Sequence, residues 1–239
     1  MELIDELQSG LKTAFIDQNI NSNLAWRPEF VSNDSKQGKR VISSIEQELM
    51  NCEKFFISVA FITLGGITPL LQTLRELEQK GIEGKILTTD YLAFNDPAAL
   101  DKLHSLKNIE LKMYCTNEDR DGFHTKGYIF KKEEVYRIIV GSSNMTAKAL
   151  KVNREWNTKL VGYESGEMVG DILREFQSLW KDPHSIAYDD FIENYRVRYE
   201  LIKSRKNVAK AVPLISLEQY KLAAKCNAGR CRKKCKRIG

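Results

Sequence analysis

The chain has 239 residues, of which 42% are hydrophobic and 29% are charged, so it is long enough to bury a full-sized core. Its longest apolar stretches, such as residues 55–64, are much shorter than the roughly 20 residues that a membrane-spanning helix requires. The N-terminus shows no basic-then-apolar secretory pattern. We therefore expect a cytoplasmic protein that makes no contact with a membrane.

The formal net charge of +5 is concentrated at the C-terminal end of the chain. The last fifteen residues contain seven lysines and arginines and no acid, so the rest of the chain is slightly acidic and any DNA-binding surface on it must be local. Three of the five cysteines, Cys226, Cys231 and Cys235, also lie there. Because a structural zinc site normally needs four ligands, we predict a flexible basic tail and no metal site. The odd number of cysteines argues against a disulfide framework.

The hydrophobic periodicity predicts helices that alternate with short strands. In chain order we expect a helix over residues 2–17, a short extended piece near 26–28, a helix over 37–51, a strand over 55–62, a helix over 67–79, a strand over 85–89, a helix over 97–106 and a strand over 109–114. A hairpin over 123–131 and 135–140, a short helix over 145–150, a strand over 155–163 and helices over 166–181 and about 187–205 complete the chain.

This alternation predicts an α/β fold with a mixed, largely parallel β-sheet flanked by helices. We expect one domain over residues 1–205, with its motif-bearing core at about 35–180, followed by a linker and the basic tail over 206–239. The sequence contains no internal repeat.

Two short segments carry the residues that chemistry would need. On a strand, residues two apart point to the same face, so His124 and Lys126 are expected to project together. Ser142 and Asn144 are also two apart, where the next strand gives way to a helix and backbone N–H groups can bind an anionic oxygen. An imidazole, an ammonium, a hydroxyl and a carboxamide suit a phosphate site. Alternatively, Ser142 and Asn144 could simply cap the following helix.

Together, His124-x-Lys126 and Gly141-Ser142-Ser143-Asn144 resemble the HxK…GSxN signature of the phospholipase D superfamily, in the form seen in its bacterial nuclease members. The order of elements over about 35–180 also fits that fold. The resemblance extends to domains at the N-terminus of superfamily II helicases and in some restriction endonucleases, which implies a helicase domain as a partner in cis or in trans. The chain itself has no ATP-binding motif of the Gly-Lys-Ser/Thr type.

In that superfamily a histidine attacks phosphorus to give a phosphohistidine, and a second histidine, from a second copy of the motif, protonates the leaving oxygen. This chain has three histidines, and neither His104 nor His184 is followed by a lysine two residues later. One chain therefore supplies half a site, and the resemblance implies a homodimer with the site on its two-fold axis. Lys126 and its symmetry mate would supply the positive charge, so we expect neither a metal nor another cofactor.

The resemblance also assigns a role to Glu155, which lies where nuclease members carry a downstream acid and would orient a histidine by accepting a hydrogen bond. A surface ion pair with Arg154 is the alternative. We expect Ser143, Lys148, Lys151 and Arg154 to contact phosphate or nucleic acid, with Lys131 and Lys132 adding basic charge. The sequence departs from the superfamily at Lys131, where an Asp is often found. Four aromatic residues are expected in the core or a dimer interface: Phe55, Phe56, Phe61 and Trp156.

The sequence thus predicts a metal-independent phosphodiesterase that acts as an endonuclease on DNA through a phosphohistidine intermediate at a homodimeric site. Two alternatives stay open. The missing Asp could mark a non-catalytic domain that binds DNA phosphates and serves a helicase or restriction system. The same motif could instead serve a phospholipid phosphodiesterase.

Overall fold

The computed structural model describes residues 2–116 and 122–211. The predicted basic tail from residue 212 onward, with Cys226, Cys231 and Cys235, lies outside the described residues. Residues up to Tyr199 form one compact unit, and those from Glu200 onward belong to a second. Helix α8 (Tyr188–Ala211) continues past residue 205, where the sequence analysis placed the end of the domain.

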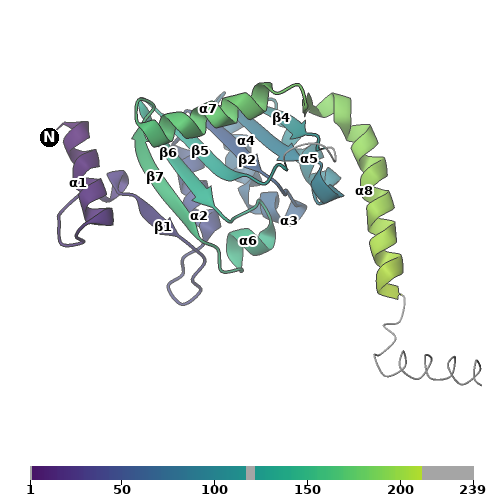
Figure 1. Cartoon of the computed structure of the whole chain (residues 1–239), viewed down its shortest axis with the longest axis horizontal. Helices are drawn as coiled ribbons and strands as arrows, with labels where there is room; N and C mark the ends of the chain where they lie inside the picture. The colour runs from purple at the N-terminus through teal and green to yellow at the C-terminus, as the bar shows by residue number, and fades with distance from the viewer. Residues whose placement is uncertain (1, 117–121, 212–239) are drawn as a thin grey trace, which may run out of the picture. The chain divides into compact units, whose positions relative to one another are not determined.

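One eight-stranded sheet forms the centre of the first unit (Figure 1). In spatial order its strands are β1 (Glu29–Val31), β7 (Asn157–Tyr163), β6 (Val135–Gly141), β5 (Lys126–Lys132), β2 (Lys54–Val59), β3 (Glu83–Thr89), β4 (Ile109–Tyr114) and β8 (Ser185–Ala187). Strands β2, β3 and β4 are parallel, and the other neighbouring pairs are antiparallel. The predicted α/β class and mixed sheet are confirmed, with the parallel part restricted to these three strands. The short strand β8 was not predicted.

The helices follow the predicted order, with one break. They are α1 (Leu3–Phe15), α2 (Val41–Asn51), α3 (Leu64–Ile67), α4 (Leu71–Gln79), α5 (Pro97–His104), α6 (Ala147–Lys151) and α7 (Glu167–Lys181), with 3-10 turns at Leu24–Trp26, Thr68–Leu70 and Tyr91–Ala93. The helix predicted over 67–79 is divided because the 3-10 turn carries Pro69 in its first positions, and proline has no N–H to donate within a helix.

Helices cover both faces of the sheet, with α7 in front of it and α2 and α4 behind it in Figure 1. On the α7 side, Phe176 packs in one buried cluster with Phe56 and Ile129. Strand β5 alternates its side chains, so Tyr128 and Phe130 point to the opposite face. This two-sided burial fixes β5, whose first residue is Lys126, in the middle of the sheet.

Four strand ends meet at one edge of the sheet. Strand β2 ends at Val59, which pairs with Lys126 at the start of β5. Strand β6 ends at Gly141, which pairs with Asn157 at the start of β7. Because β5 is antiparallel to both β2 and β6, its first residues lie beside their last ones. The two motif segments therefore meet at this edge.

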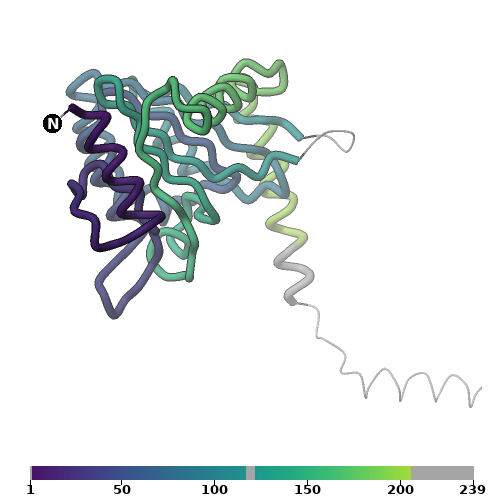
Figure 2. The backbone as a smooth tube through the Cα atoms, turned by 60° about the vertical axis from the view of Figure 1, so that its left-hand side comes forward, coloured from purple at the N-terminus to yellow at the C-terminus, as the bar shows by residue number. Residues whose placement is uncertain are grey.

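The N-terminal region covers the β7 side of the sheet. Figure 2 shows α1 beside β7, where Leu7 packs with Val135 and Val161 in a small buried cluster. Strand β1 pairs with β7 and is the last strand on this side. Phe30, in the middle of β1, is left 62% exposed.

The register of β2 and β3 can be tested at Gly84, which pairs with Phe55. A Cβ atom at Gly84 would lie 2.0 Å from Cζ of the fully buried Phe55 ring. We expect Gly84→Ala to lower the free energy of unfolding in urea by about 1–3 kcal/mol through overpacking. The same change at Gly122, where a Cβ meets nothing within 4 Å, should stay within about 0.5 kcal/mol of the wild type. Equal effects of the two substitutions would contradict this register.

Candidate active site

The first motif segment brings His124 and Lys126 into direct contact. His124 lies in the extended segment just before β5, because the strand begins at Lys126 and not at residue 123 as predicted. The Nζ atom of Lys126 lies 2.9 Å from Nδ1 of His124 and donates to the His124 carbonyl oxygen at 2.9 Å. The ring of Phe61 packs edge-on against the imidazole, with a centroid distance of 5.9 Å. The exposed imidazole is thus held by two contacts within its own chain.

The second motif segment is fastened to the end of β2 by backbone hydrogen bonds. The N–H of Met145 donates to the carbonyl of Phe61 and the N–H of Thr63 donates to the carbonyl of Met145, each at 3.0 Å. Oδ1 of Asn144 accepts from the N–H of Phe61 at 3.1 Å. No described residue accepts a hydrogen bond from Nδ2 of Asn144, which leaves this amide group as a donor. Phe61 therefore joins the two motif segments, since it contacts His124 on one side and Asn144 on the other.

Glu155 also belongs to this group of residues, but its partner differs from the one that the resemblance implied. The Ser142 hydroxyl donates to the Glu155 carboxylate and accepts from the N–H of Trp156 at 3.1 Å. The other carboxylate oxygen of Glu155 lies 3.5 Å from Nδ2 of Asn153. Glu155 therefore holds Ser142 and not His124 of the same chain. Arg154, the alternative partner, forms no ion pair with any described residue.

Burial and a neighbouring charge shift the pKa of Lys126 in opposite directions. Partial burial lowers the pKa of Lys126 below its ordinary value because it disfavours the charged ammonium, and the negative charge of Glu155 opposes this shift. Lys126 of the first motif segment is thus coupled electrostatically to Glu155, which accepts a hydrogen bond from Ser142 of the second. Beneath them, complete burial raises the pKa of Tyr128, whose hydroxyl donates to the carbonyl oxygen of Ser143 at 3.0 Å. A neutral phenol therefore supports the loop from below.

Ser143 lies in the interior, although the sequence analysis assigned it to phosphate or nucleic-acid binding. It is 0% exposed, and its Oγ accepts from Nδ2 of Asn157 at 2.9 Å. Asn157 also accepts from the N–H of Ser143 at 3.2 Å and donates to the carbonyl of Val31 at 3.1 Å. Ser143 has no exposed surface to offer a phosphate, so it fixes the loop instead. Asn157 was not among the predicted residues. It could have been found in the sequence as an amide side chain at the start of a strand, two positions after Glu155.

Ser58 and Thr125 were also missed by the sequence analysis. Their hydroxyl oxygens lie 2.6 Å apart, and the N–H of Ala60 donates to the carbonyl of Thr125 at 3.1 Å. These bonds extend the pairing of β2 with β5 by one residue beyond Lys126. They hold the segment that carries His124 against the end of β2.

The predicted basic residues divide into two groups. Lys148 and Lys151 lie in the last turn of α6, close in the chain to Arg154, and none of the three forms an ion pair with a described residue. Lys131 lies five residues along β5 from Lys126, roughly 17 Å away at the ordinary rise of a strand. Its Nζ lies over the Tyr136 ring, 5.7 Å from the centroid. The position where the superfamily often has an Asp is therefore remote from His124, and so is Lys132.

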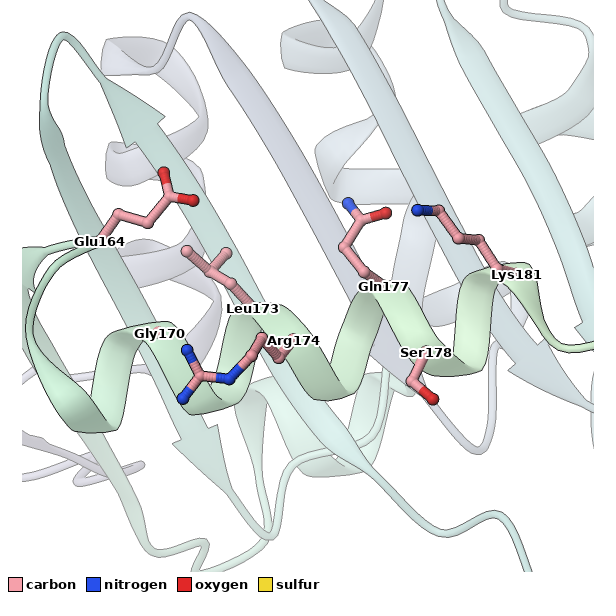
Figure 3. A pocket seen from close by; sticks show the side chains of 7 residues that line it. All are labelled: Glu164, Gly170, Leu173, Arg174, Gln177, Ser178 and Lys181. Atoms are coloured by element: carbon pink, nitrogen blue, oxygen red, sulfur yellow. The ribbon is translucent and has the colours of Figure 1, made fainter.

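A groove of about 530 Å³ adjoins His124 and Lys126 and reaches Ile172 and Phe176 of α7. A second groove, of about 350 Å³, lies between α7 and the end of β7 (Figure 3). Its Arg174 pairs with Asp171, and its Glu164 accepts from the Tyr136 hydroxyl at 3.1 Å. No motif residue lines the second groove, so the first is the one that adjoins the candidate site. Within the described residues, no group of three or more His, Cys, Asp and Glu side chains could hold a metal ion.

Comparison with known proteins identifies the family. Residues 45–180 match the family described as "Cardiolipin synthase, PLD-like domain", which is more than half of the chain. The chain therefore belongs to the phospholipase D-like family. A search of curated proteins gave no match.

Two solved structures share the fold. NucT from Helicobacter pylori is 12% identical, with a TM-score of 0.53, and the match covers 67% of this chain and 99% of NucT. Nuc from Salmonella typhimurium, a phospholipase D family member, is 16% identical, with a TM-score of 0.50, and the match covers 68% of this chain and 99% of Nuc. At these identities the likeness concerns the fold alone. Among the described residues no helix has the length and apolar character needed to cross a membrane.

The coupling of Glu155 to Lys126 can be measured by chemical labelling. Removing the negative charge in Glu155→Gln should lower the pKa of Lys126 further, because that charge favours the ammonium. Lys126 should then react with acetic anhydride at a lower pH than in the wild type, as followed by peptide mass spectrometry over a pH series. Glu164→Gln, beyond the other end of β7, is the matched control. A Lys126 profile that is the same in both variants would contradict the coupling.

The buried amide of Asn157 gives a second test. Asn157→Ala leaves Ser143 and the Val31 carbonyl without their partner, and unsatisfied buried groups of this kind cost about 1–3 kcal/mol. We expect that decrease in the free energy of unfolding by urea titration. Asn153→Ala, at an exposed position with one long contact, should change it by less than about 0.5 kcal/mol. Similar losses in both variants would show that Asn157 does not anchor the loop.

Proposed function

We propose that this protein is a metal-independent phosphodiesterase that cuts DNA as an endonuclease, through a phosphohistidine formed on His124 at a homodimeric site. The observation that carries the proposal is the convergence of five predicted residues at one sheet edge. Lys126 contacts His124, Asn144 is bound to the residue that packs on His124, and Ser142 is held by Glu155, whose charge acts on Lys126. This group offers a nucleophile and three donors for phosphate oxygens.

The proposed reaction has two steps. In the first, Nε2 of His124 forms a bond to phosphorus while the bond from phosphorus to the leaving oxygen breaks, and that oxygen takes a proton from His124 of the partner subunit. In the second, a water oxygen attacks phosphorus, the histidine of the partner subunit accepts the water proton, and the N–P bond breaks. Nε2 can attack only when the imidazole proton is on Nδ1, so the Lys126 N–H that faces Nδ1 turns to the phosphate and offsets its negative charge. Asn144 and Ser142 would donate to the remaining oxygens.

A second copy of the chain is the proposed source of the second histidine. The chain's other histidines have different contacts, since His104 stacks on Tyr188 with centroids 3.8 Å apart and Nδ1 of His184 lies 2.7 Å from Asp182. Near the site, Phe94 packs on Phe61, which touches His124, and Phe94 is 42% exposed. Leu92, two residues earlier, is 48% exposed with a φ of 53°. This strained apolar turn offers a surface for the second subunit.

DNA is the proposed substrate because unpaired basic residues follow the second motif segment. Lys148 and Arg154 are exposed, Lys151 is half-buried, and Glu155 next to them is part of the site. Lysine and arginine side chains supply the sequence-independent part of DNA binding. A helicase domain in cis or in trans stays a prediction.

The family description supports one other candidate, a phospholipid phosphodiesterase, since it names a cardiolipin synthase. Turnover of phosphatidylglycerol or phosphatidylcholine vesicles above that of His124→Ala, without turnover of DNA, would favour it.

Cleavage of labelled DNA in excess EDTA tests the proposed activity. The wild type should cut under these conditions, and His124→Ala should lose at least about 1,000-fold in rate because the nucleophile is absent. His104→Ala is the matched control and should keep wild-type activity. If all three proteins bind DNA with a steep salt dependence and none cuts it, the non-catalytic binding domain replaces the enzyme.

The composite site predicts how mixed subunits behave. Sedimentation should give twice the chain mass of 27.5 kDa. After subunit exchange with an equal amount of His124→Ala, only dimers with two wild-type chains should cut, so the activity per total amount of protein should be about one quarter of that of the wild type. If each chain worked alone, the activity per total amount of protein would be about one half of that of the wild type. A mass of one chain across micromolar concentrations, with activity intact, would rule out the shared site.

A further inference from the structure

A groove of about 590 Å³ lies next to the candidate site and is not used by the proposed chemistry. Two aromatic side chains border it, Trp156 from the residue just before β7 and Phe30 from β1. Trp156 is 74% exposed and Phe30 is 62% exposed, and their rings meet edge to face at 5.8 Å. Trp156 was predicted to lie in the core or in a dimer interface, and its exposure excludes the core. Two large aromatic faces are therefore open to solvent.

The charges around this groove favour an anionic ligand. Lys36, Lys151 and Arg154 line it and form no ion pair within the described part of the chain. Its two acids already have donors, since Asp34 accepts from the backbone N–H groups of Lys36 and Gln37, and Glu155 accepts from Ser142. The three bases and two acids give the lining a net charge of +1, and the bases form no ion pair with the described residues. The groove thus combines aromatic faces with basic side chains.

The groove is continuous with the proposed phosphate site through Glu155. This residue lines the groove and holds Ser142, while the N–H of Trp156 donates to the same Ser142 hydroxyl at 3.1 Å. A polymer whose phosphodiester lies at Ser142 and His124 would pass its next nucleotide over Trp156.

We infer that this groove is a subsite for unpaired nucleotides, in which bases stack on Trp156 and Phe30 while Lys36, Lys151 and Arg154 bind the flanking phosphates. The inference rests on the proposed function and makes its substrate class single-stranded nucleic acid. Stacking requires open base faces, which a paired duplex does not offer along its length, and it is tolerant of sequence because every base has a π-face. The subsite would therefore favour single strands without a sequence preference.

Binding to two oligonucleotides with the same phosphates separates stacking from charge. The probes are a twelve-nucleotide oligothymidylate and its stable abasic counterpart, with tetrahydrofuran residues in place of the nucleosides. Dissociation constants are measured by anisotropy on His124→Ala protein, which should not cut either probe. We expect the thymidylate to bind about 10-fold tighter or more than the abasic strand, and Trp156→Ala or Phe30→Ala to remove most of this preference. Phe15→Ala removes an equally exposed ring from α1, and it should keep the preference.

Three results would overturn the inference. One is equal affinity for the two probes, and another is an unchanged preference in both Trp156→Ala and Phe30→Ala. The third is a fall of the sedimentation mass to one chain in Trp156→Ala, which would place this ring in a subunit interface. Circular dichroism of each variant establishes that it is folded.

Cleavage of the two probes distinguishes failure of the proposed subsite from failure of the proposed phosphodiesterase activity. His124-dependent cutting of both probes at equal rates would reject the subsite and keep the phosphodiesterase. If neither probe is cut while the base preference depends on Trp156, the subsite stands and the catalytic proposal fails.

Discussion

The candidate site depends on one short set of backbone hydrogen bonds, those that fasten the loop after β6 to the end of β2. Phe61 accepts from Met145 and donates to Oδ1 of Asn144, and Met145 in turn accepts from Thr63. The central strands determine where this happens, because β5 lies between β2 and β6 and starts where they end. Without these bonds the two motif segments would be neighbours in the sheet with no fixed geometry between their side chains.

The residues around this connection range from buried ones that support the loop to exposed ones that can contact a substrate. Ser143, Tyr128 and Asn157 are buried and satisfy one another, which makes the loop rigid. Above them, Ser142 and His124 are exposed and keep polar atoms available to a substrate. Preorganised donors of this kind stabilise charge on a phosphoryl group more effectively than mobile ones. The proposed chemistry therefore relies on buried residues that hold the loop and on exposed residues that reach the substrate.

The sequence was sufficient for the class of fold. Short-range spacing predicted that His124 lies beside Lys126 and that Ser142 lies near Asn144, and the resemblance to the superfamily added that these two segments and Glu155 belong to one site. The sequence was insufficient for features that depend on which segments pair or pack in the folded chain. Strand β5 starts at Lys126 because its partner β2 ends opposite, at Val59, and periodicity along one strand does not contain that limit. Burial of Ser143 and exposure of Trp156 likewise depend on which neighbour covers each residue. The partner of Glu155 depends on how far β6 and β7 extend together.

In the proposed reaction, His124 forms a covalent bond to the phosphorus of the substrate. The most direct measurement is mass spectrometry of the protein after rapid quenching with base during turnover of a short single-stranded oligonucleotide, since phosphohistidine survives base and not acid. We expect a nucleotidyl adduct on the peptide that contains His124, and no adduct in His124→Ala or His124→Gln. Cleavage without any adduct at His124, or an adduct on another residue, would contradict the proposed reaction.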